Sequence, residues 1–439
     1  MLSKEENELL ERVGPGQPMG EVFRRFWIPA LLTEEIPAPD SPPVRVRLLG
    51  EDLIAFRDTS GEVGIFDAYC PHRNAPLFFG RNEEGGLRCI YHGWKFDHTG
   101  QCIDMPNCLE GPDFKERVRV PAYPTFEGGN MVWVYMGPST SSGRGPSDVP
   151  PKPGFEWLDL PSDHVYVTKY FVQCNYLQTL ENEFDIGHSA FLHSTLNPAG
   201  SQSNRIIGGN PLVNPLARRG RVANTEVYDT PYGSASGRRT EDGRLALSAH
   251  FMMPSFSTAG AVSAPNTNPL NLKLPVDDEN TVFFRMKWSS EPLKPEVLNS
   301  YLYGKHEFPE RIPGTYVTKA NKTNDYLQDR ALQRNFNFSG MNPYPVQDFA
   351  MVEDQRGPVA DRSRETLVSS DTYIIHMRRK LLEACEKVLA GEDLEQPWHP
   401  EAYHGIRNFK VLSAEEEASQ VTLARAARKV TPEIAAGGS

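Results

Sequence analysis

The sequence predicts two domains, a small all-β domain followed by a larger α+β domain built on an antiparallel sheet. Three observations support this division. The chain has 439 residues, more than one hydrophobic core usually serves. Short β-type runs fill the region from Pro43 to about Gly137, and a stretch dense in Pro, Gly and Ser follows, from Gly137 to Gly154. We therefore expect domains at residues 1–150 and 151–439.

Each element of the first domain has its own signal. Residues 1–35 are expected to be helical, with Pro18 near the start of an amphipathic run. Four later runs are rich in branched and aromatic residues, which is typical of strands. They are VRVRLLG, EDLIAFRD, EVGIFDAY and, from Asn130, NMVWVYM.

The second domain mixes helices and strands. We expect a helix from Asn175 to about His193 and strands within residues 247–288. A late helix is expected from about Thr372 to Ala390, because apolar residues recur there at steps of three or four and Gly391 follows as a helix-ending glycine.

Composition excludes several classes of protein. Hydrophobic residues make up 39% and charged residues 23% of the chain, as in an ordinary soluble globular protein. The net charge of −11 speaks against a nucleic-acid partner. No apolar run is long enough to cross a bilayer, and the polar N-terminus does not resemble a signal peptide, so we expect a cytoplasmic protein. We therefore do not expect the six cysteines to form a disulfide framework.

Two cysteines and two histidines form the first candidate metal site. Cys70 and His72 are followed, after sixteen residues, by Cys89 and His92. Such a set could bind one zinc ion, or a [2Fe–2S] cluster with both cysteines on one iron and both histidines on the other. The cluster is favoured, because each loop mixes the two ligand types and because Gly93-Trp94 follows, a glycine that lets backbone amides approach sulfur and an aromatic ring that can shield it.

CPHRNAPLFFG and RCIYHGWKFDHTG resemble the Rieske motif of the Rieske non-haem iron ring-hydroxylating oxygenases. The resemblance implies that residues 1–150 are a Rieske [2Fe–2S] domain with an N-terminal helical segment. It also implies that Cys70 and Cys89 hold one iron and His72 and His92 the other.

A second candidate site lies in the expected helix from Asn175. His188 and His193 are possible metal ligands, but residues five apart lie about 140° around an ideal helix. They can share a metal only if the helix ends or opens into a π-type turn between them, which Gly187 would make easier. A carboxylate would complete a 2-His-1-carboxylate site with positions open for O₂ and substrate.

Asp348, Asp354 and Asp361 are the candidates for that carboxylate. QDFAMVEDQRGPVADRS resembles the family segment in which the ligand aspartate stands five residues before a glutamate, here Asp348 and Glu353. Asp348 is therefore preferred, and the other two aspartates are interpreted as surface or salt-bridging acids.

Polar residues around His188 have family counterparts as well. By resemblance, Asp185 hydrogen-bonds the first histidine ligand and also a cluster histidine, which links the two metal centres. Asn182 and Glu181 match polar positions near the iron, while Asn175 is also explained as a helix cap.

The resemblance covers nearly the whole chain, and GPGQPMGEVFRRFWIPALL is similar to the phthalate dioxygenase-like large subunits. It implies a helix-grip-like α+β catalytic domain with mononuclear Fe(II), a homotrimer or a hexamer of trimers, and electrons from NAD(P)H through a separate flavin and [2Fe–2S] reductase, directly or by a ferredoxin. The expected reaction uses O₂ to hydroxylate or dihydroxylate an aromatic carboxylic acid or related aryl compound. The alternative is O-demethylation of a methoxylated aromatic acid.

Four arginines of the second domain could bind a substrate carboxylate. They are Arg205, Arg218, Arg219 and Arg285. Two other functions remain possible at this point. One is an electron carrier with an inert second domain, which the histidine pair argues against, and the other is a zinc-stabilised binding protein.

Overall fold

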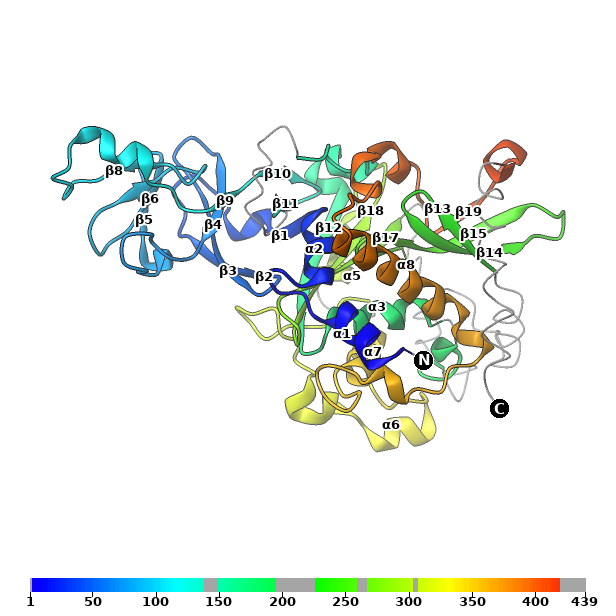
Figure 1. Ribbon diagram of the computed structural model, residues 1–439. Helices are drawn as coiled ribbons and strands as arrows, with labels where there is room; N and C mark the ends of the chain where they lie inside the picture. Colours follow the sequence, from blue (N-terminus) through cyan, green and yellow to red (C-terminus); the bar gives the residue numbers. More distant parts are fainter. Residues whose placement is uncertain are drawn as a thin grey trace.

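The computed structural model describes residues 2–137, 149–185, 187–194, 226–258, 267–302 and 307–418, whose strands form four antiparallel sheets (Figure 1). Three small sheets lie in the N-terminal part, with strand orders β1-β11-β10, β2-β3-β4-β9 and β5-β6-β7-β8. Their strands are β1 (Trp27–Leu32), β2 (Val44–Leu48), β3 (Glu51–Arg57), β4 (Val63–Asp67), β5 (Arg81–Glu83), β6 (Gly86–Arg88), β7 (Lys95–Phe96), β8 (Cys102–Asp104), β9 (Ala122–Tyr123), β10 (Thr125–Gly128) and β11 (Met131–Tyr135).

The C-terminal part contains one eight-stranded sheet of order β12-β18-β17-β16-β15-β14-β13, with β19 paired to β15. Its strands are β12 (Val165–Val172), β13 (Glu226–Thr230), β14 (Gly233–Arg239), β15 (Leu245–Met252), β16 (Phe256–Ser257), β17 (Asn268–Pro275), β18 (Thr281–Trp288) and β19 (Phe409–Val411). The α-helices are α1 (Lys4–Glu11), α2 (Pro18–Arg24), α3 (Tyr176–Phe184), α5 (Pro295–Leu302), α6 (Arg330–Asn335), α7 (Tyr344–Val352) and α8 (Thr372–Leu389). This arrangement confirms the expected order of a β domain and an α+β domain.

The expectation that residues 1–35 are helical is wrong for the last part of that segment. Trp27–Leu32 is the strand β1, which pairs antiparallel with β11. All six of its residues are buried, and Pro29 interrupts any helical pattern. A continuous apolar run of this length fits a strand buried on both faces better than the surface helix that we expected.

The sheet of the C-terminal part has two different faces around β18. Phe284 and Met286 lie in the main hydrophobic core of the molecule. Phe283, which alternates with them, packs in a separate cluster with Val346 and Phe349 of α7. Helix α7 therefore covers this second face, and the residues two and four positions after Phe283 on β18 point toward it.

The late helix was expected at its observed position. Helix α8 ends at Leu389, and Gly391 has the positive φ of 76° that favours glycine after a helix. Helices α1 and α2 lie beside α8 in Figure 1, and Met19 Sδ lies 3.7 Å from Cys385 Sγ. The first two helices thus pack on the C-terminal part of the chain.

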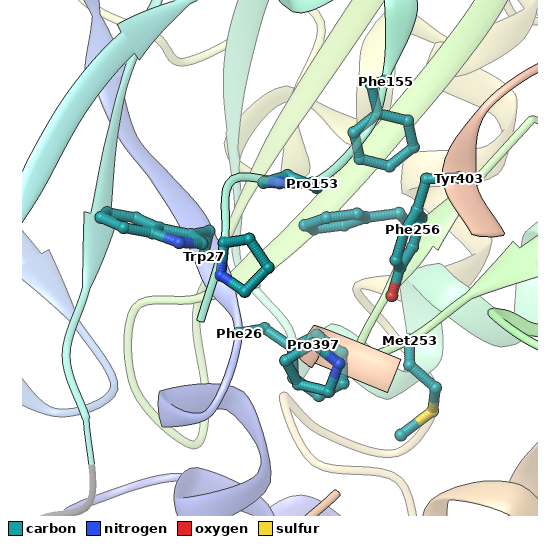
Figure 2. Close-up of a pocket in the computed structure, with 9 residues that line it drawn as sticks. Phe26, Trp27, Pro153, Phe155, Met253, Phe256, Pro397 and Tyr403 are labelled. Carbon is teal, nitrogen blue, oxygen red and sulfur yellow. The ribbon is translucent and has the colours of Figure 1, made fainter. Parts of the chain in front are cut away.

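A small apolar pocket lies where the two parts of the molecule meet (Figure 2). Its walls come from β1, from residues 151–155, from the β15–β16 region and from the C-terminal segment. They are Phe26, Trp27, Pro151, Pro153, Phe155, Met253, Phe256, Pro397 and Tyr403. None of these residues is a candidate metal ligand, so this pocket is separate from the predicted site. No helix within the described residues is long and apolar enough to cross a membrane.

Candidate metal centres

The two loops that carry the cysteine and histidine pairs share one backbone conformation. In each loop the cysteine N–H donates to the carbonyl five residues on, at 2.9 Å for Cys70 and 2.8 Å for Cys89. In each loop the residue four positions after the cysteine has a positive φ, 54° for Asn74 and 81° for Gly93. Asn and Gly are the residues that tolerate this conformation best. The spacing of CPHRN and CIYHG therefore encodes two matching turns.

These turns bring the four predicted cluster ligands to one end of the β domain. Cys70 and Cys89 are buried, and the rings of His72 and His92 lie 4.4 Å apart between centroids. Trp94, the ring expected to shield sulfur, stacks on the imidazole of His72 at 4.4 Å between centroids with an interplanar angle of 9°. Burial raises the pKa of Cys70 to about 12, and the neighbouring Cys89 thiol adds to the shift.

The geometry of this set fits a two-iron cluster better than a zinc ion. His72 Nδ1 is buried and has no hydrogen-bond partner in the described part of the chain, as a metal-ligating nitrogen would without its metal. Ligand atoms around one tetrahedral zinc lie within about 4 Å of one another. Among described residues, the only group of three or more candidate ligand atoms lying within 4.8 Å of one another is His188, His193 and Asp348. A [2Fe–2S] cluster, with the thiolates on one iron and the imidazoles on the other, needs no such convergence.

The helix that leads to the second site is shorter than expected. Helix α3 ends at Phe184, and Asp185 has extended backbone angles of φ −76° and ψ 90°. His188–Ala190 then forms a 3-10 turn. Of the two expected ways of bringing the histidines together, the end of the helix is observed, although it comes before His188 and not between the pair. No π-type turn occurs in the described residues of this segment.

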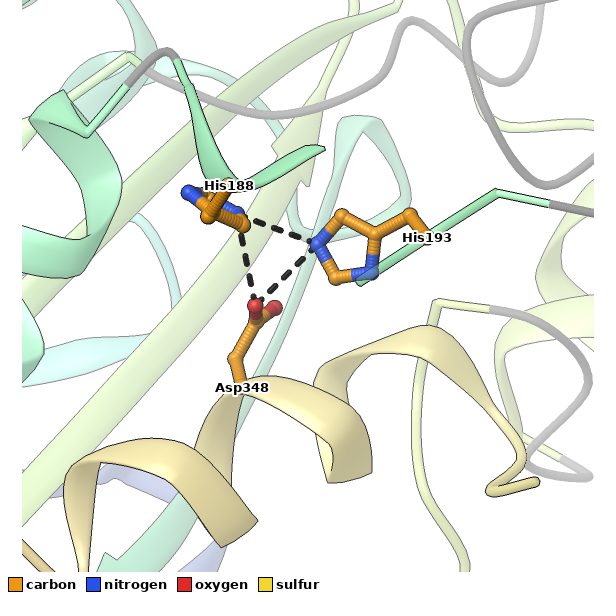
Figure 3. A group of neighbouring side chains, drawn as sticks. All are labelled: His188, His193 and Asp348. Carbon is orange, nitrogen blue, oxygen red and sulfur yellow. Dashed lines mark hydrogen bonds and ion pairs between the residues drawn. The ribbon is translucent and has the colours of Figure 1, made fainter. Parts of the chain in front are cut away.

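His188, His193 and Asp348 converge from the end of α3 and from α7 (Figure 3). The two Nε2 atoms lie 3.1 Å apart. Asp348 Oδ1 lies 3.1 Å from His193 Nε2 and 3.5 Å from His188 Nε2. Two imidazoles and one carboxylate that face a common point are the donor set of a 2-His-1-carboxylate iron site.

Hydrogen bonds fix the tautomer of both histidines. His188 Nδ1 donates to the main-chain carbonyl of Asp185, and His193 Nδ1 donates to Gln347 Oε1 at 2.7 Å. Each ring therefore presents the lone pair of Nε2 toward Asp348, because the proton is held on Nδ1. This orientation prepares both imidazoles to bind a metal.

Asp348 is prepared for the same task. Its Oδ1 is buried and accepts no hydrogen bond within the described residues. Burial opposes the charged form, yet the two imidazoles, when Nε2 carries a proton in place of a metal, and a hydrogen bond from Asn182 hold the pKa of Asp348 below its usual range. The side chain is therefore an anion with one oxygen left free, and Asn182 lies beside it.

Asp185 takes a position different from the one that the resemblance implies. Its Oδ1 accepts the backbone N–H groups of Gly187 and His188, at 2.8 and 3.2 Å. Its Oδ2 is 3.9 Å from His188 Nδ1, so the carbonyl of Asp185, and not the carboxylate, holds this imidazole within one chain. The carboxylate is about a third exposed and remains accessible to another group.

The other acids near the motifs have structural roles. Asp354 is 71% exposed and pairs with Lys322, and Asp361 caps the turn at Ser363. Glu181 faces away from Asp348 and binds the guanidinium groups of Arg362 and Arg378. Its expected place near the iron is therefore wrong.

Two further predictions concern Asn175 and the arginines. Asn175 is the helix cap that we expected, since its side chain accepts the N–H of Leu177. Arg285 is buried on β18 and donates to the Tyr344 hydroxyl. Arg205, Arg218 and Arg219 lie outside the described residues.

Gln347 is the residue of this site that sequence analysis missed. It is 4% exposed, and its Nε2 donates to the carbonyl of Met341 at 2.8 Å, which fixes the amide that holds His193. Its only sequence signal is its position next to Asp348, a place that helix geometry turns away from the metal by about 100°.

Family models match both parts of the chain. The model of the Rieske [2Fe-2S] domain matches residues 26–124, and the model described as LigXa C-terminal domain like matches residues 134–398. Together with the two ligand sets, these matches define the class of protein. The chain belongs to the Rieske non-haem iron oxygenases, as a terminal oxygenase with a Rieske cluster, mononuclear iron and O₂ as co-substrate.

Curated relatives place it in the phthalate dioxygenase-like branch. It is 38% identical to the phthalate 4,5-dioxygenase oxygenase subunit of Pseudomonas putida, over 89% of this chain and 88% of that one. It is 37% identical to the 3-chlorobenzoate-3,4-dioxygenase oxygenase subunit of Comamonas testosteroni, over 88% and 89%. The 5,5'-dehydrodivanillate O-demethylase oxygenase subunit of a Sphingobium strain is 31% identical, over 90% and 82%. Like these subunits, the chain is one component of a system with separate electron-transfer partners.

Solved structures agree in fold. NdmA of Pseudomonas putida CBB5 with caffeine matches with a TM-score of 0.57 at 19% identity, over 90% of this chain and 99% of that one. The terminal oxygenase of carbazole 1,9a-dioxygenase from Nocardioides aromaticivorans IC177 matches with a TM-score of 0.53 at 19% identity, over 87% and 96%. These matches support the arrangement of a Rieske domain and a catalytic domain with an antiparallel sheet.

Proposed function

We propose that this oxygenase hydroxylates or dihydroxylates an aromatic carboxylic acid or a related aryl compound. The observation that carries the proposal is the convergence of His188, His193 and Asp348 at one point of a chain that also has the Rieske ligand set. Two of the relatives that match most of the chain are named for phthalate and 3-chlorobenzoate, which are aryl carboxylates. We also propose that the boundary between the Rieske domain and the catalytic domain lies between residues 150 and 151.

Seven side chains would hold the metals. Cys70 and Cys89 would bind one iron of the cluster, and His72 and His92 the other. His188, His193 and Asp348 would bind the mononuclear iron. When bound, the cluster supplies electrons and the mononuclear iron activates O₂.

The remaining residues position these ligands. The Asp185 carbonyl and Gln347 keep protons on the Nδ1 atoms of His188 and His193, so that both Nε2 atoms stay free for the metal. Asn182 donates to Asp348 and stabilises its charged form. Three protein ligands on one side leave the other positions of the metal for O₂ and substrate.

We also propose that the protein works as a head-to-tail homotrimer, alone or as a hexamer of two such trimers. In Figure 1 the cluster end, marked by β5, β6 and β8, lies far from α3 and α7 within one chain. Large apolar side chains are exposed at the cluster end, among them Ile90 at 61%, Tyr91 at 56% and Leu109 at 96%. Such a patch suits contact with a second copy. The accessible Asp185 carboxylate of one chain would then bond a cluster histidine of its neighbour.

Electrons would come from NAD(P)H through a flavin and [2Fe–2S] reductase, directly or by a ferredoxin. Dependence on this cofactor pool places the system in the cytoplasm. The alternative reaction is O-demethylation of a methoxylated aromatic acid, which the O-demethylase relative favours.

The test measures oxygen uptake by the purified protein with a surrogate reductase and NADH. Aryl carboxylates and methoxylated aryl acids are offered as two panels, and products are identified by mass spectrometry. We expect uptake coupled to product in at least one panel, and formaldehyde only if the methoxylated acids are substrates. Tight coupling to an alkane or a quaternary amine, with no response to either panel, would refute the substrate class.

A further inference from the structure

Three basic residues are buried on the face of the sheet that α7 covers. Arg285 and Lys287 lie two and four residues after Phe283 on the same face of β18, and Lys273 is the cross-strand neighbour of Phe283 on β17. All three are at most 5% exposed. Because Phe283 packs on α7, these cations lie between the sheet and the helix that carries Asp348.

Only one of these cations lacks a carboxylate. Lys273 Nζ lies 3.3 Å from Glu183 Oε1, and Lys287 Nζ lies 3.0 Å from Glu307 Oε2. Arg285 forms no ion pair with any described residue. An arginine does not lose its proton in a protein, so Arg285 is a buried cation, and the two carboxylates that act on it, Glu183 and Glu307, are already paired with lysines.

Donor groups without acceptors surround the guanidinium of Arg285. Its Nη2 donates to the hydroxyl of Tyr344, but its buried Nε has no acceptor among the described residues. The Tyr344 hydroxyl accepts from Arg285 and has its own proton to donate to a ligand. Thr168 is the cross-strand partner of Arg285 on β12, and its buried Oγ1 has no partner in the described part of the structure.

These donors lie beside the metal ligands. Tyr344 precedes Asp348 by four residues on α7, so the two side chains share one face of the helix. The Tyr344 ring lies 5.4 Å from the ring of His193 between centroids. A ligand held by Arg285 and Tyr344 would therefore be next to the 2-His-1-carboxylate site.

We propose that Arg285, Tyr344 and Thr168 bind the carboxylate of the aromatic substrate and set its ring toward the metal centre. The site combines a planar guanidinium, which matches a carboxylate, with two hydroxyl donors from separate elements. The carboxylate would give Arg285 the direct ion pair that no described residue provides. This inference rests on the proposed function and adds the residues that select an acid over a neutral aromatic compound.

The test compares a carboxylate probe with a neutral probe of the same shape. Binding of benzoate and benzamide to the iron-loaded protein is measured by calorimetry, and coupled oxygen uptake is measured with phthalate, benzoate and benzamide. For Arg285→Gln we expect benzoate affinity to fall about 10- to 100-fold, since a hydrogen-bonded charge partner is lost, with benzamide little changed. The benzoate affinity of Arg285→Lys should lie between those of the wild type and Arg285→Gln. Thr168→Val should weaken benzoate binding about fivefold.

Arg239→Gln is the matched control, because Arg239 lies on β14 of the same sheet and pairs with Glu417 at the surface. It should bind both probes as the wild type does.

Equal losses of affinity for benzoate and benzamide in Arg285→Gln, or no loss for either, would overturn the proposal. If Arg285→Gln does not fold, the selective loss in Thr168→Val decides in the same way. A wild type that oxygenates only neutral aromatic compounds would overturn the anion site and leave the oxygenase function standing. A wild type that couples oxygen uptake to no aromatic compound would contradict both the carboxylate site and the proposed function.

Discussion

Gln347 orients His193, and its loss should weaken the mononuclear metal site. In Gln347→Ala the Nδ1 proton of His193 loses its acceptor, so the ring can turn or change tautomer. We expect affinity for Fe(II) to fall about 10- to 100-fold, the usual effect of removing such a partner. Gln347→Glu retains an acceptor and should lose less. Anaerobic titration with Fe(II) against a competing chelator measures the difference, and wild-type affinity in Gln347→Ala would contradict the role.

At the residue scale, the positions of the candidate cluster ligands can be predicted from the sequence because their spacing is tied to turns. Cys70 and Cys89 each stand four residues before a position with positive φ, and the residues there are Asn and Gly. Glu181 and Gln347 were misjudged for the opposite reason. Their roles depend on which side of a helix faces the metal, and on partners about 180 and 150 residues away in sequence.

At the element scale, the attachment of α1 depends on a buried set of charges. The carboxylates of Glu11, Glu181 and Glu365 face the guanidinium groups of Arg362 and Arg378. With three acids and two bases, one carboxylate is in excess. Burial accordingly raises the pKa of Glu11 to about 7, although Arg362 Nη1 lies 2.6 Å away and opposes the shift.

This arrangement predicts that α1 is held more tightly at acidic pH. The pKa of Glu11 in the folded protein lies above its ordinary value of 4.5, so folding takes up a proton between about pH 4.5 and 7. The contribution of Glu11 to stability is therefore present in full below that range and is lost as pH rises through 7. Hydrogen exchange of the α1 amides, corrected for intrinsic rates, should show greater protection at pH 5.5 than at pH 8. Glu11→Gln should flatten this dependence, and an opposite slope would contradict the assignment.

The strand β1 and the early end of α3 show why element boundaries escaped sequence analysis. Trp27–Leu32 is a strand because β11, about 100 residues later, supplies its hydrogen bonds. Helix α3 ends at Phe184 although the helical pattern continues, because the Asp185 carboxylate accepts the next turn's N–H groups. Helix α8 depends on local apolar spacing and a following glycine, and it was predicted to within one residue at its C-terminal end.

At the scale of the whole molecule, the separation of the cluster end from α3 and α7 predicts transfer between chains. A Cys70→Ala chain and an Asp348→Ala chain should each be inactive alone. Co-expressed, they should form mixed oligomers in which an intact cluster of one chain faces an intact iron of the next, and turnover should partly return. Verified mixed oligomers without activity would show that electrons pass within a chain.

Asp185 offers an independent check of the same arrangement. Asp185→Asn keeps the main-chain carbonyl that holds His188, so both metal centres should stay largely filled. Turnover should nevertheless fall about 10- to 100-fold, because the negative bridge to the neighbouring cluster is lost. Single-turnover reduction of the mononuclear site, followed by its own spectrum, separates slow transfer from loss of iron. An unchanged rate of electron transfer from the cluster to the mononuclear site would show that Asp185 does not take part in this transfer.

The central claim is that one chain carries a Rieske cluster and a separate iron at His188, His193 and Asp348. The most direct test is the analysis of iron and acid-labile sulfide in the wild type, Asp348→Ala and Asp354→Ala. We expect about three irons and two sulfides per chain in the wild type and in the exposed Asp354→Ala control. Asp348→Ala should keep about two irons, two sulfides and the Rieske spectrum. Zinc as the main metal, or loss of the third iron from Asp354→Ala but not from Asp348→Ala, would contradict the claim.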